Sequence, residues 1–448
     1  MRACFIYAVC LVMALPVLGA GFKVGVGKVD ITPGEAVRLA GYASRSKPFE
    51  TIEAPLFVKA LAVEDEGGAV TVIVTADTIG TPRWFNDALA ERLEKELGVK
   101  RERFVFACSH THSAPVIHGS LTAMYGLTED EAKKTEAYTK LFLEKSFEAA
   151  AAAVKDLAAA KLSFAKGKAT FAGNRRQFGP KGVGFGINPN GPVDHEVPVL
   201  KVEREDGTIK AVLFGYACHC TTPGATPEVS GDWAGYAQAN LEQTYPGATA
   251  LFITGCGADM NPNPRGSMLL ARAHGLHLAG AVAAVLTAPM DPVEGKVTPV
   301  FERVTLPLGE LPNREYYAAK LTDKAPAVQR YAQRHLEMLA KGEPLMKSYE
   351  APVQVLRFGG SFTLVALSGE VVVDYALRLR RDLPKETLWT AGYCNDVFAY
   401  VPSMRILTEG GYEADFNLIY YSFPTRFAPA VEDTLVGRVV EMVKGTKK

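Results

Sequence analysis

Apolar, β-rich runs alternate with helical patterns along most of this chain, which leaves few folds open to it. In the first half, strand-like runs occupy Ala69–Ala76, Arg103–Ala107, Lys210–Ala217 and Ala248–Thr254, and helical periodicity occupies Trp84–Leu97, Thr128–Ala160, Trp233–Glu242 and Ser267–Leu286. The second half adds strand patterns at Val297–Leu308, Ala351–Arg357 and Phe362–Leu367, and helical patterns at Arg314–Ala340 and Val371–Arg381. This alternation predicts an α/β fold, a single large domain of mixed β-sheets flanked by helices.

Composition narrows the class of protein. Hydrophobic residues make up 48% of the 448 residues and charged residues 22%, as in an ordinary globular protein. Lysine plus arginine and aspartate plus glutamate both number 49, so the formal net charge is zero. A chain without a basic excess is not expected to bind nucleic acid.

The N-terminus has the pattern of a signal peptide. Arg2 precedes an apolar run, Ala3–Leu15, and the small-residue stretch Val17–Ala20 follows. We expect residues 1–20 to be removed and residues 21–448 to be exported, to a periplasm or outside the cell. The mature chain would then have no transmembrane span, and its contact with a membrane surface would at most be transient. An uncleaved anchor is the alternative.

Several polar residues stand just after the apolar β-runs. Asp77, His110, His219 and Glu370 each occupy such a position. Ligand sites in open α/β sheets gather at the carboxyl ends of the strands. Every strand must end in something polar, so the identity of these residues matters more than their position.

The sharpest motif is Cys108-Ser109-His110-Thr111-His112, which leaves a strand-like run. In an extended chain His110 and His112 project to the same side, so one or both could bind a metal ion. The alternative is a pair of hydrogen-bonded histidines at a strand end.

A second strand runs into Cys218-His219-Cys220. The two cysteines alternate to the face opposite His219, so a zinc site built from all three is awkward and His219 is the better ligand. We interpret the cysteines as small buried hydrophobic residues. Cleavage of the leader would leave five cysteines, an odd number, so at least one thiol would stay free or pair between chains.

A third motif, Gly255–Gly266, is rich in glycine, proline and asparagine and contains Asp259 and Asn261. This composition predicts a tight, shaped loop that could approach a ligand closely, although a structural turn is the alternative. The loop lacks the Gly-Lys-Ser/Thr ending of a phosphate-binding loop.

Taken in series, these motifs resemble the neutral ceramidase family. The resemblance rests on the following segments: Val24–Pro33, Ser109–Pro115, Gly173–Arg175, His219 through Asp232, Asp259–Asn263, Ser368–Glu370, Asn395–Tyr400 and Tyr412–Ala414. It covers roughly residues 24 to 430 and keeps the family's order. It implies a zinc-dependent amidase that cleaves the N-acyl bond of ceramide.

The resemblance also implies roles for single residues. The zinc ligands would be His110, His219, Glu370 and Tyr400. His112 would carry protons, and Arg175, with Tyr400, would face the developing oxyanion. Asp259, Asn261 and Tyr412 are the expected substrate-binding residues.

The chain departs from the family pattern in three places. Asn261 stands where family members have a serine important for activity, and an amide cannot form an acyl-enzyme. Gly231-Asp232-Trp233-Ala234-Gly235 replaces the family's Gly-Asp-Asn-Lys-Gly. We also expect the C-terminal β-sandwich of longer members to be absent. The resemblance therefore supports the family's metal site in this chain more strongly than it supports ceramide as the substrate.

We expect an exported zinc hydrolase that cleaves an N-acyl amide of a lipid-like or other N-acylated substrate through a zinc-activated water. Six aromatic residues between Tyr412 and Phe427 would line a groove for the acyl chain, or else form the core of a closing strand. Two other functions stay open: a zinc-dependent hydrolase of esters or small polar substrates, and a non-catalytic binding module with a structural zinc.

Overall fold

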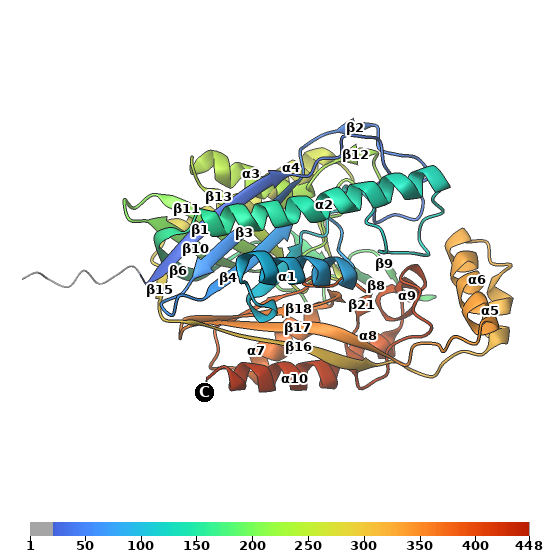
Figure 1. Cartoon of the computed structure of the whole chain (residues 1–448). Helices are drawn as coiled ribbons and strands as arrows, with labels where there is room; N and C mark the ends of the chain where they lie inside the picture. The colour runs from blue at the N-terminus through green and yellow to red at the C-terminus, as the bar shows by residue number, and fades with distance from the viewer. Residues whose placement is uncertain (1–20, 448) are drawn as a thin grey trace, which may run out of the picture.

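The computed structural model describes residues 21–447, so the leader predicted at residues 1–20 lies outside the described residues. Two β-sheets pack face to face, and helices cover the outer face of each sheet (Figure 1). The predicted α/β arrangement of mixed sheets flanked by helices is confirmed.

The larger sheet has nine strands: β1 (Phe22–Asp30), β3 (Phe57–Glu64), β4 (Val70–Ala76), β5 (Phe104–Cys108), β6 (Ala158–Lys168), β10 (Glu196–Arg204), β11 (Ile209–Tyr216), β13 (Thr249–Thr254) and β15 (Asp291–Val293). Its order is β13-β11-β10-β6-β1-β3-β4-β5, and β15 pairs with β6. The outermost pairs, β11 with β13 and β4 with β5, are parallel, whereas the strands between them are antiparallel.

The smaller sheet has four strands, β16 (Val297–Pro307), β17 (Ser348–Phe358), β18 (Phe362–Leu367) and β20 (Leu388–Ala391), in that order. Its inner face packs on the larger sheet through a shared core that includes Phe164, Leu251, Phe362 and Trp389. Strands β4 and β5 are buried on both faces, and this explains why their sequences are nearly continuous apolar runs.

The outer helices fall into three groups. Helices α1 (Arg83–Leu97) and α2 (Glu129–Lys155) cover one half of the larger sheet, and α3 (Asp232–Thr244) and α4 (Met268–Thr287) cover the other half. Helices α7 (Val373–Asp382) and α10 (Val431–Gly445) cover the smaller sheet. The pair α5 (Arg314–Lys320) and α6 (Pro326–Ala340) lies at one end of the molecule (Figure 1).

Short elements complete the chain. They are the strand pairs β2 (Thr51–Ile52) with β12 (Glu228–Val229), β7 (Ala172–Asn174) with β14 (Met260–Pro262), β8 (Arg176–Gly179) with β9 (Gly182–Phe185) and β19 (Glu370–Val371) with β21 (Tyr400–Val401), the helices α8 (Met404–Glu409) and α9 (Asn417–Tyr420), a 3₁₀ turn at Arg101–Arg103 and a π-helical turn at Tyr412–Phe416. Several of these pairs lie beside the histidine motifs.

Two glycines in β1 allow α2 to pack closely. A Cβ atom at Gly25 or Gly27 would collide with the backbone carbonyls of Ala153 and Ala149 in α2. The alanine-rich end of α2 meets these glycines, so two small-residue surfaces bring helix and strand together. The glycines of the N-terminal motif therefore serve packing.

Two predicted helices have different limits in the structure. The helix expected at Thr128–Ala160 ends at Lys155, and its last alanines begin β6. The helix expected at Arg314–Ala340 is two helices, because Pro326 starts a new one. The closing strand considered for Tyr412–Phe427 does not form, since this segment is helical up to Tyr420.

Burial accounts for two further features. All five cysteines within residues 21–447 are buried and unpaired, as expected for small hydrophobic residues. Among the described helices, α4 alone has the length and apolar composition of a membrane span. A buried core helix has the same properties, and α4 packs on α3 and the larger sheet.

One segment joins the two edges of the larger sheet. Residues 392–395, after β20, pair with β5 on one side and β13 on the other: Cys108 N–H donates to Tyr393, and Gly392 N–H donates to Thr254. The carboxyl ends of β5, β11, β13 and β18 consequently meet in one region. The polar residues that follow these strands are brought together there.

Candidate metal centre and substrate pocket

Two backbone contacts place the histidine motifs side by side. Thr111 forms a parallel bridge with Cys220, and His112 N–H donates to the Cys220 carbonyl at 3.1 Å. His110 has φ +58°, a strained conformation for a residue other than glycine, and such strain is often found at functional sites.

The ring orientations of His110 and His219 are fixed by backbone carbonyls. Nδ1 of His219 lies 2.9 Å from the Gly257 carbonyl, and Nδ1 of His110 contacts the Ile79 carbonyl. A carbonyl can only accept, so each Nδ1 carries the proton and each Nε2 keeps a lone pair. Burial lowers the pKa of His219 to about 4, which keeps its ring neutral.

Glu370 faces both unprotonated nitrogens. Its Oε2 lies 3.0 Å from His110 Nε2 and 3.2 Å from His219 Nε2, yet this buried atom has no hydrogen-bond donor. Three lone pairs therefore converge without a proton between them. A bound cation would satisfy all three, and two imidazoles with a carboxylate form a ligand set that suits zinc.

Tyr400 reaches the same point through a short strand pair. Glu370 and Tyr400 are register partners in the β19–β21 pair, and the Tyr400 hydroxyl lies 3.1 Å from His219 Nε2. Tyr421 supports the carboxylate from behind, donating its hydroxyl hydrogen to Glu370 Oε1 at 2.6 Å. The structure thus brings together all four residues that the family resemblance implies as zinc ligands.

His112 lies beside this group, on the pocket side. His110, His112 and His219 form a cluster that could hold a metal ion, with ligand atoms within 4.8 Å of one another. His112 Nε2 lies 3.2 Å from His110 Nε2, while its Nδ1 is buried without a hydrogen-bond partner. This geometry is compatible with a further ligand and with the proton carrier expected from the sequence.

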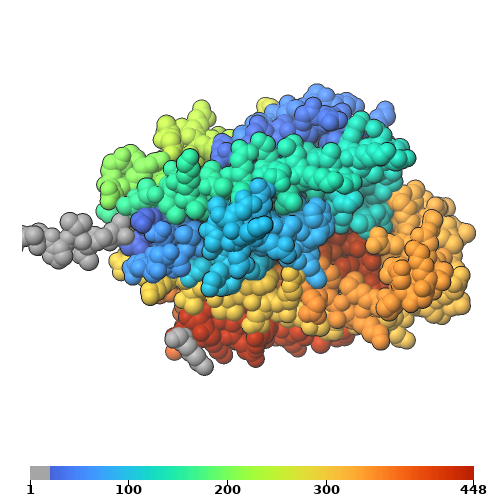
Figure 2. All heavy atoms as spheres, in the orientation of Figure 1, coloured from blue at the N-terminus to red at the C-terminus, as the bar shows by residue number. Residues whose placement is uncertain are grey.

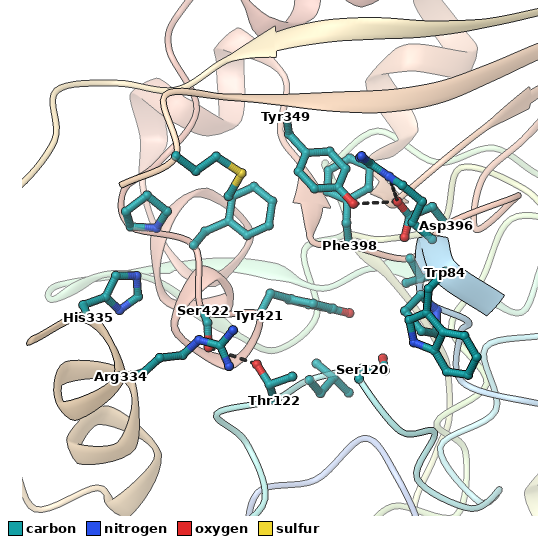
Figure 3. Close-up of a pocket in the computed structure, with 18 of the residues that line it drawn as sticks. Trp84, Ser120, Thr122, Arg334, His335, Tyr349, Asp396, Phe398, Tyr421 and Ser422 are labelled. Carbon is teal, nitrogen blue, oxygen red and sulfur yellow. Dashed lines mark hydrogen bonds and ion pairs between the residues drawn. The ribbon is translucent and has the colours of Figure 1, made fainter. Parts of the chain in front are cut away.

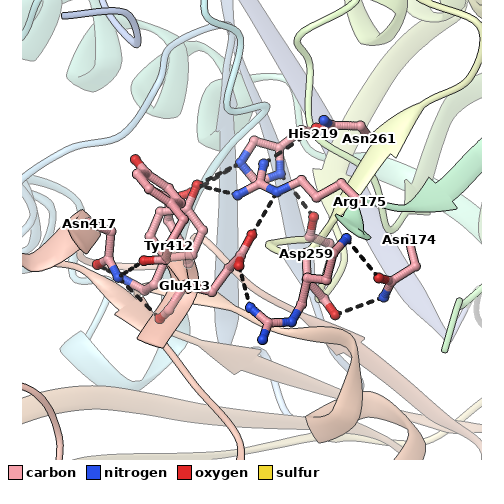
Figure 4. A network of polar contacts seen from close by, with 12 residues as sticks. Asn174, Arg175, His219, Asp259, Asn261, Tyr412, Glu413 and Asn417 are labelled. Carbon is pink, nitrogen blue, oxygen red and sulfur yellow. Dashed lines mark hydrogen bonds and ion pairs between the residues drawn. The ribbon is translucent and has the colours of Figure 1, made fainter. Parts of the chain in front are cut away.

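Arg175 links the centre to a buried ion-pair network (Figure 4). Its guanidinium donates to the Tyr400 hydroxyl at 3.0 Å and to Glu413 Oε1 at 2.8 Å. Burial alone would raise the pKa of Glu413, but Arg175 and Arg176 outweigh it and lower that pKa. Arg175 is therefore held rigidly, with its charge balanced by Glu413.

Asn261 and Asp259 lie at different depths. Asn261 lines the pocket; Arg175 Nη1 and the Thr221 hydroxyl both lie 3.3 Å from its Oδ1, and its amide nitrogen makes no hydrogen bond within the described residues. Asp259 is fully buried, and its carboxylate accepts from Val373 N–H and the Asn174 side chain. Asp259 thus fixes the loop and lies outside the pocket where substrate contact was expected.

A pocket of about 230 Å³ opens over the centre. Its lining comprises Gly41, Tyr42, Ala43, His112, Met124, Arg175, Phe185, Thr221, Asn261, Arg265, Tyr400, Tyr412 and Tyr420. A second pocket, also about 230 Å³, shares Phe185, Asn261 and Arg265 with it. Of the six aromatic residues expected near a groove, Tyr412 and Tyr420 line the first pocket, whereas Phe423 and Phe427 belong to the core.

A larger cavity, about 590 Å³, is lined in part by Tyr421, the residue whose hydroxyl binds Glu370 (Figure 3). Trp84, Tyr349 and His335 are among its lining residues, and none of the three clustered histidines is. In Figure 2 the red C-terminal segments are visible in a hollow between the α1–α2 surface and the orange α5–α6 pair. This cavity lacks the convergent lone pairs of the histidine centre.

Sequence reasoning missed four residues around the centre. Glu413 pairs with Arg175, Tyr421 binds Glu370, and Asn417 Oδ1 accepts from Tyr400 N–H at 3.2 Å. Arg265 lines both small pockets. Three of them stand in segments that the sequence singles out: Glu413 in the Tyr412–Ala414 motif, Arg265 in the Gly255–Gly266 loop, and Tyr421 among the aromatic residues between Tyr412 and Phe427.

A model of the family "neutral/alkaline non-lysosomal ceramidase, N-terminal" matches residues 22–274. The chain belongs to this family. The matched range contains His110, His112, Arg175, His219, Asp259 and Asn261, whereas Glu370, Tyr400 and Tyr412 lie beyond it.

Relatives and solved structures agree with the family. Neutral ceramidases of Drosophila melanogaster and Drosophila pseudoobscura pseudoobscura are 32% identical over 101 and 99 residues, which is 22% and 21% of this chain and 14% of each relative. The neutral ceramidase structure from Pseudomonas aeruginosa matches 94% of this chain and 74% of its own, with a TM-score of 0.72 and 20% identity. A structure described as ceramidase complexed with C2 gives the same TM-score at 18% identity, over 94% and 75%. At these identities the two structures establish the ceramidase fold for this chain.

Proposed function

We propose that this member of the ceramidase family is a zinc-dependent hydrolase that cleaves an N-acyl amide bond in a lipid-like substrate. One observation carries the proposal. Two histidine nitrogens with lone pairs and an unpartnered carboxylate oxygen converge beside a pocket. Family membership supports a ceramidase-type hydrolase, and the metal, the substrate and the location are the finer parts of the proposal.

His110, His219, Glu370 and Tyr400 are the residues that would hold the ion. Zinc, when bound, polarises a carbonyl and lowers the pKa of water from 15.7 to about 7. No protein nucleophile is then needed. This agrees with Asn261, whose amide cannot form an acyl-enzyme.

His112 would move the proton in this scheme. It lines the pocket and lies next to His110. We assign to it the transfer of a proton from the attacking water to the departing nitrogen. A positioned acid–base group of this kind typically contributes about 10² to 10⁴ in rate.

Arg175 and Asn261 would orient the substrate. Arg175 is held by Glu413 and Tyr400, so its guanidinium is in place before the substrate binds. Preorganised donors of this kind are typically worth roughly 3 kcal/mol when they face a developing oxyanion. Asn261 would donate an amide hydrogen where family members have a serine hydroxyl.

The pocket walls support a substrate with an apolar part. Phe185, Tyr412 and Tyr420 contribute aromatic surface, and Met124 adds a flexible apolar side chain. These residues would hold the acyl chain and exclude water from the scissile bond. Tyr412 and Tyr420 are the members of this wall that belong to the aromatic stretch singled out in the sequence.

Export of residues 21–448 as one domain is part of the proposal. It is supported by Arg2 and the apolar run that follows, both outside the described residues. If the leader is cleaved as proposed, the N-terminus of the purified mature protein will begin close to Gly21. Mass spectrometry of the protein from its native host measures this directly.

Hydrolysis of esters or small polar substrates is the second candidate. It is favoured by the polar residues of the pocket, which include Thr221, Asn261 and Arg265. A non-catalytic module with a structural zinc is less well supported, because structural zinc sites are closed and this centre adjoins a pocket.

A substrate panel tests the proposal. The purified protein is incubated with N-acyl amides and the corresponding esters, with added zinc and after treatment with a chelator. We expect zinc-dependent cleavage of amides. Cleavage of esters alone would establish the second candidate, and no cleavage of any compound by zinc-loaded protein would favour the binding module.

A further inference from the structure

Arg265 lies at the pocket and has no ion-pair partner among the described residues. Its guanidinium lines both small pockets, and its side-chain hydrogen bond within residues 21–447 goes to the Tyr42 hydroxyl at 3.3 Å. No carboxylate of the described residues lies within ion-pair distance of it. Arg265 is exposed, and because arginine has five N–H donors, most of them face solvent and are accessible to a ligand.

The loop that carries Arg265 is fixed on both sides. Gly266 N–H donates to the Thr222 carbonyl at 2.7 Å, and His274 Nε2 lies 2.7 Å from the Pro264 carbonyl. The backbone on either side of Arg265 is therefore anchored to other segments. This anchoring positions the side chain at the pocket.

Neither of the two adjoining small pockets is lined by an aspartate or a glutamate. Arg45 lies beneath Tyr42, with backbone carbonyls as its hydrogen-bond partners. Asp232 attracts Arg265 electrostatically, but it is fully buried and its oxygens accept from Thr222 and Trp233 N–H. A divalent cation at the histidine centre would add further positive charge, so the pocket as a whole favours an anion.

Tyr42 connects Arg265 to the histidine centre. Its ring packs edge-on against His112, with ring centroids 5.1 Å apart, while its hydroxyl binds Arg265. An anion bound by Arg265 would therefore lie about one phenol ring away from His112. A short spacer between the anion and the scissile amide covers such a separation.

We propose that the substrate carries a carboxylate close to its scissile amide, as in an N-acyl amino acid, and that Arg265 and Tyr42 bind this carboxylate. The proposal rests on the proposed amide hydrolysis and specifies its substrate class. Asn261 agrees with it, since an amide N–H donor suits an acceptor on the ligand. A neutral headgroup would leave the charge of Arg265 without a counter-ion, with its donors bound to solvent.

Binding of an uncleavable analogue tests Arg265 independently of turnover. In 4-oxopentadecanoate a methylene replaces the amide nitrogen of N-dodecanoylglycine, and 4-oxopentadecanamide is its neutral counterpart. We expect the zinc-loaded protein to bind the carboxylate roughly 10- to 100-fold more tightly than the carboxamide, as measured by calorimetry. Arg265→Gln should reduce this ratio to near one, and Arg265→Lys should keep part of it.

Two controls accompany these variants. Arg438→Gln removes an arginine on α10 that pairs with Glu302, and it should leave the ratio unchanged. Melting temperatures of all variants establish that they are folded. If the carboxylate were held by the metal ion instead of Arg265, the preference would survive Arg265→Gln, which would overturn the proposal.

Turnover completes the test. N-dodecanoylglycine should be cleaved with a higher kcat/KM than N-dodecanoylglycinamide, N-dodecanoylethanolamine or its O-phosphate. Preference for the phosphate, lost in Arg265→Gln, would overturn the carboxylate assignment and reassign the site to phosphate. An Arg265-dependent preference in binding without cleavage of any amide would overturn the proposed function and leave the anion site standing.

Discussion

Which nitrogen of each histidine carries the proton decides what the centre can bind. The Gly257 and Ile79 carbonyls fix both Nδ1 protons, so His110 and His219 present lone pairs toward Glu370. Without these two carbonyls either ring could donate to the carboxylate. The arrangement would then be an ordinary buried hydrogen-bonded pair.

His219→Ala should remove most of the metal from the purified protein. The substitution deletes one converging nitrogen and leaves Glu370 with a single imidazole partner. Elemental analysis of the folded variant measures the effect, with His277→Ala as control, because His277 is exposed on α4. A full zinc content in His219→Ala would contradict the assignment of His219 as a ligand.

His112→Ala distinguishes the two roles of this residue. If His112 carries protons, the variant keeps its metal and its turnover falls by roughly 10² to 10⁴. Metal content and kcat are measured on the same preparation. Loss of the metal together with activity would make His112 a ligand instead, in line with its place in the three-histidine cluster.

Single residues of the site differ in how far the sequence reveals them. The His-Thr-His spacing and the strand-end position point to His110 and His219 directly. The ligand roles of Glu370 and Tyr400 follow from the family resemblance, because their register pairing depends on how two distant segments meet. Tyr421 and Arg265 lie in segments that the sequence singles out, but the contact of Tyr421 with Glu370 and the place of Arg265 at the pocket result from long-range packing.

At the level of elements, the close contact between β1 and α2 depends on glycine. Gly27→Ala would press a Cβ atom against the Ala149 carbonyl of α2. We expect this overpacking to lower the free energy of unfolding by about 1–3 kcal/mol. Denaturant titration of the purified variant measures the change.

Gly437→Ala is the matched control for this substitution. Gly437 is exposed in α10, and nothing lies within 4 Å of its added Cβ. Alanine there should raise the free energy of unfolding by about 0.5–1 kcal/mol, because it lowers the entropy cost of helix formation. Equal effects of the two substitutions would show that contact with α2 is not what requires glycine at position 27.

Element types were largely predictable, and element limits were less so. The apolar runs at β4, β5, β11, β13 and β18 became strands because burial on both faces leaves an unmistakable pattern. The predicted end of α2 was wrong because alanine favours helix locally. In the structure Ala158–Ala160 instead form the start of β6, where they pair with β1. Tertiary pairing there outweighs local propensity.

For the whole molecule, the question is whether the metal supports the fold or the reaction. The hydrophobic clusters of both sheets are extensive, and Tyr400 is the one proposed ligand that belongs to them, so burial of apolar side chains can hold the fold without the ion. We therefore expect a chelator to abolish turnover while the melting temperature falls only slightly, and added zinc to restore activity. A sharp drop in melting temperature on chelation would favour a structural zinc.

The length of the acyl chain tests whether the aromatic wall of the pocket is a binding surface. Phe185, Tyr412 and Tyr420 line the pocket beside the histidine centre. If they bind the chain, each buried methylene should lower the activation free energy by up to about 0.8 kcal/mol. The value of kcat/KM should then rise nearly fourfold per carbon until the pocket is full. Amides with the same headgroup and increasing acyl length measure this slope. Asn261→Ser is the matched comparison, because it should change headgroup preference more than chain-length preference. A flat response from short to long chains, with turnover intact, would exclude a lipid substrate and favour small polar ones.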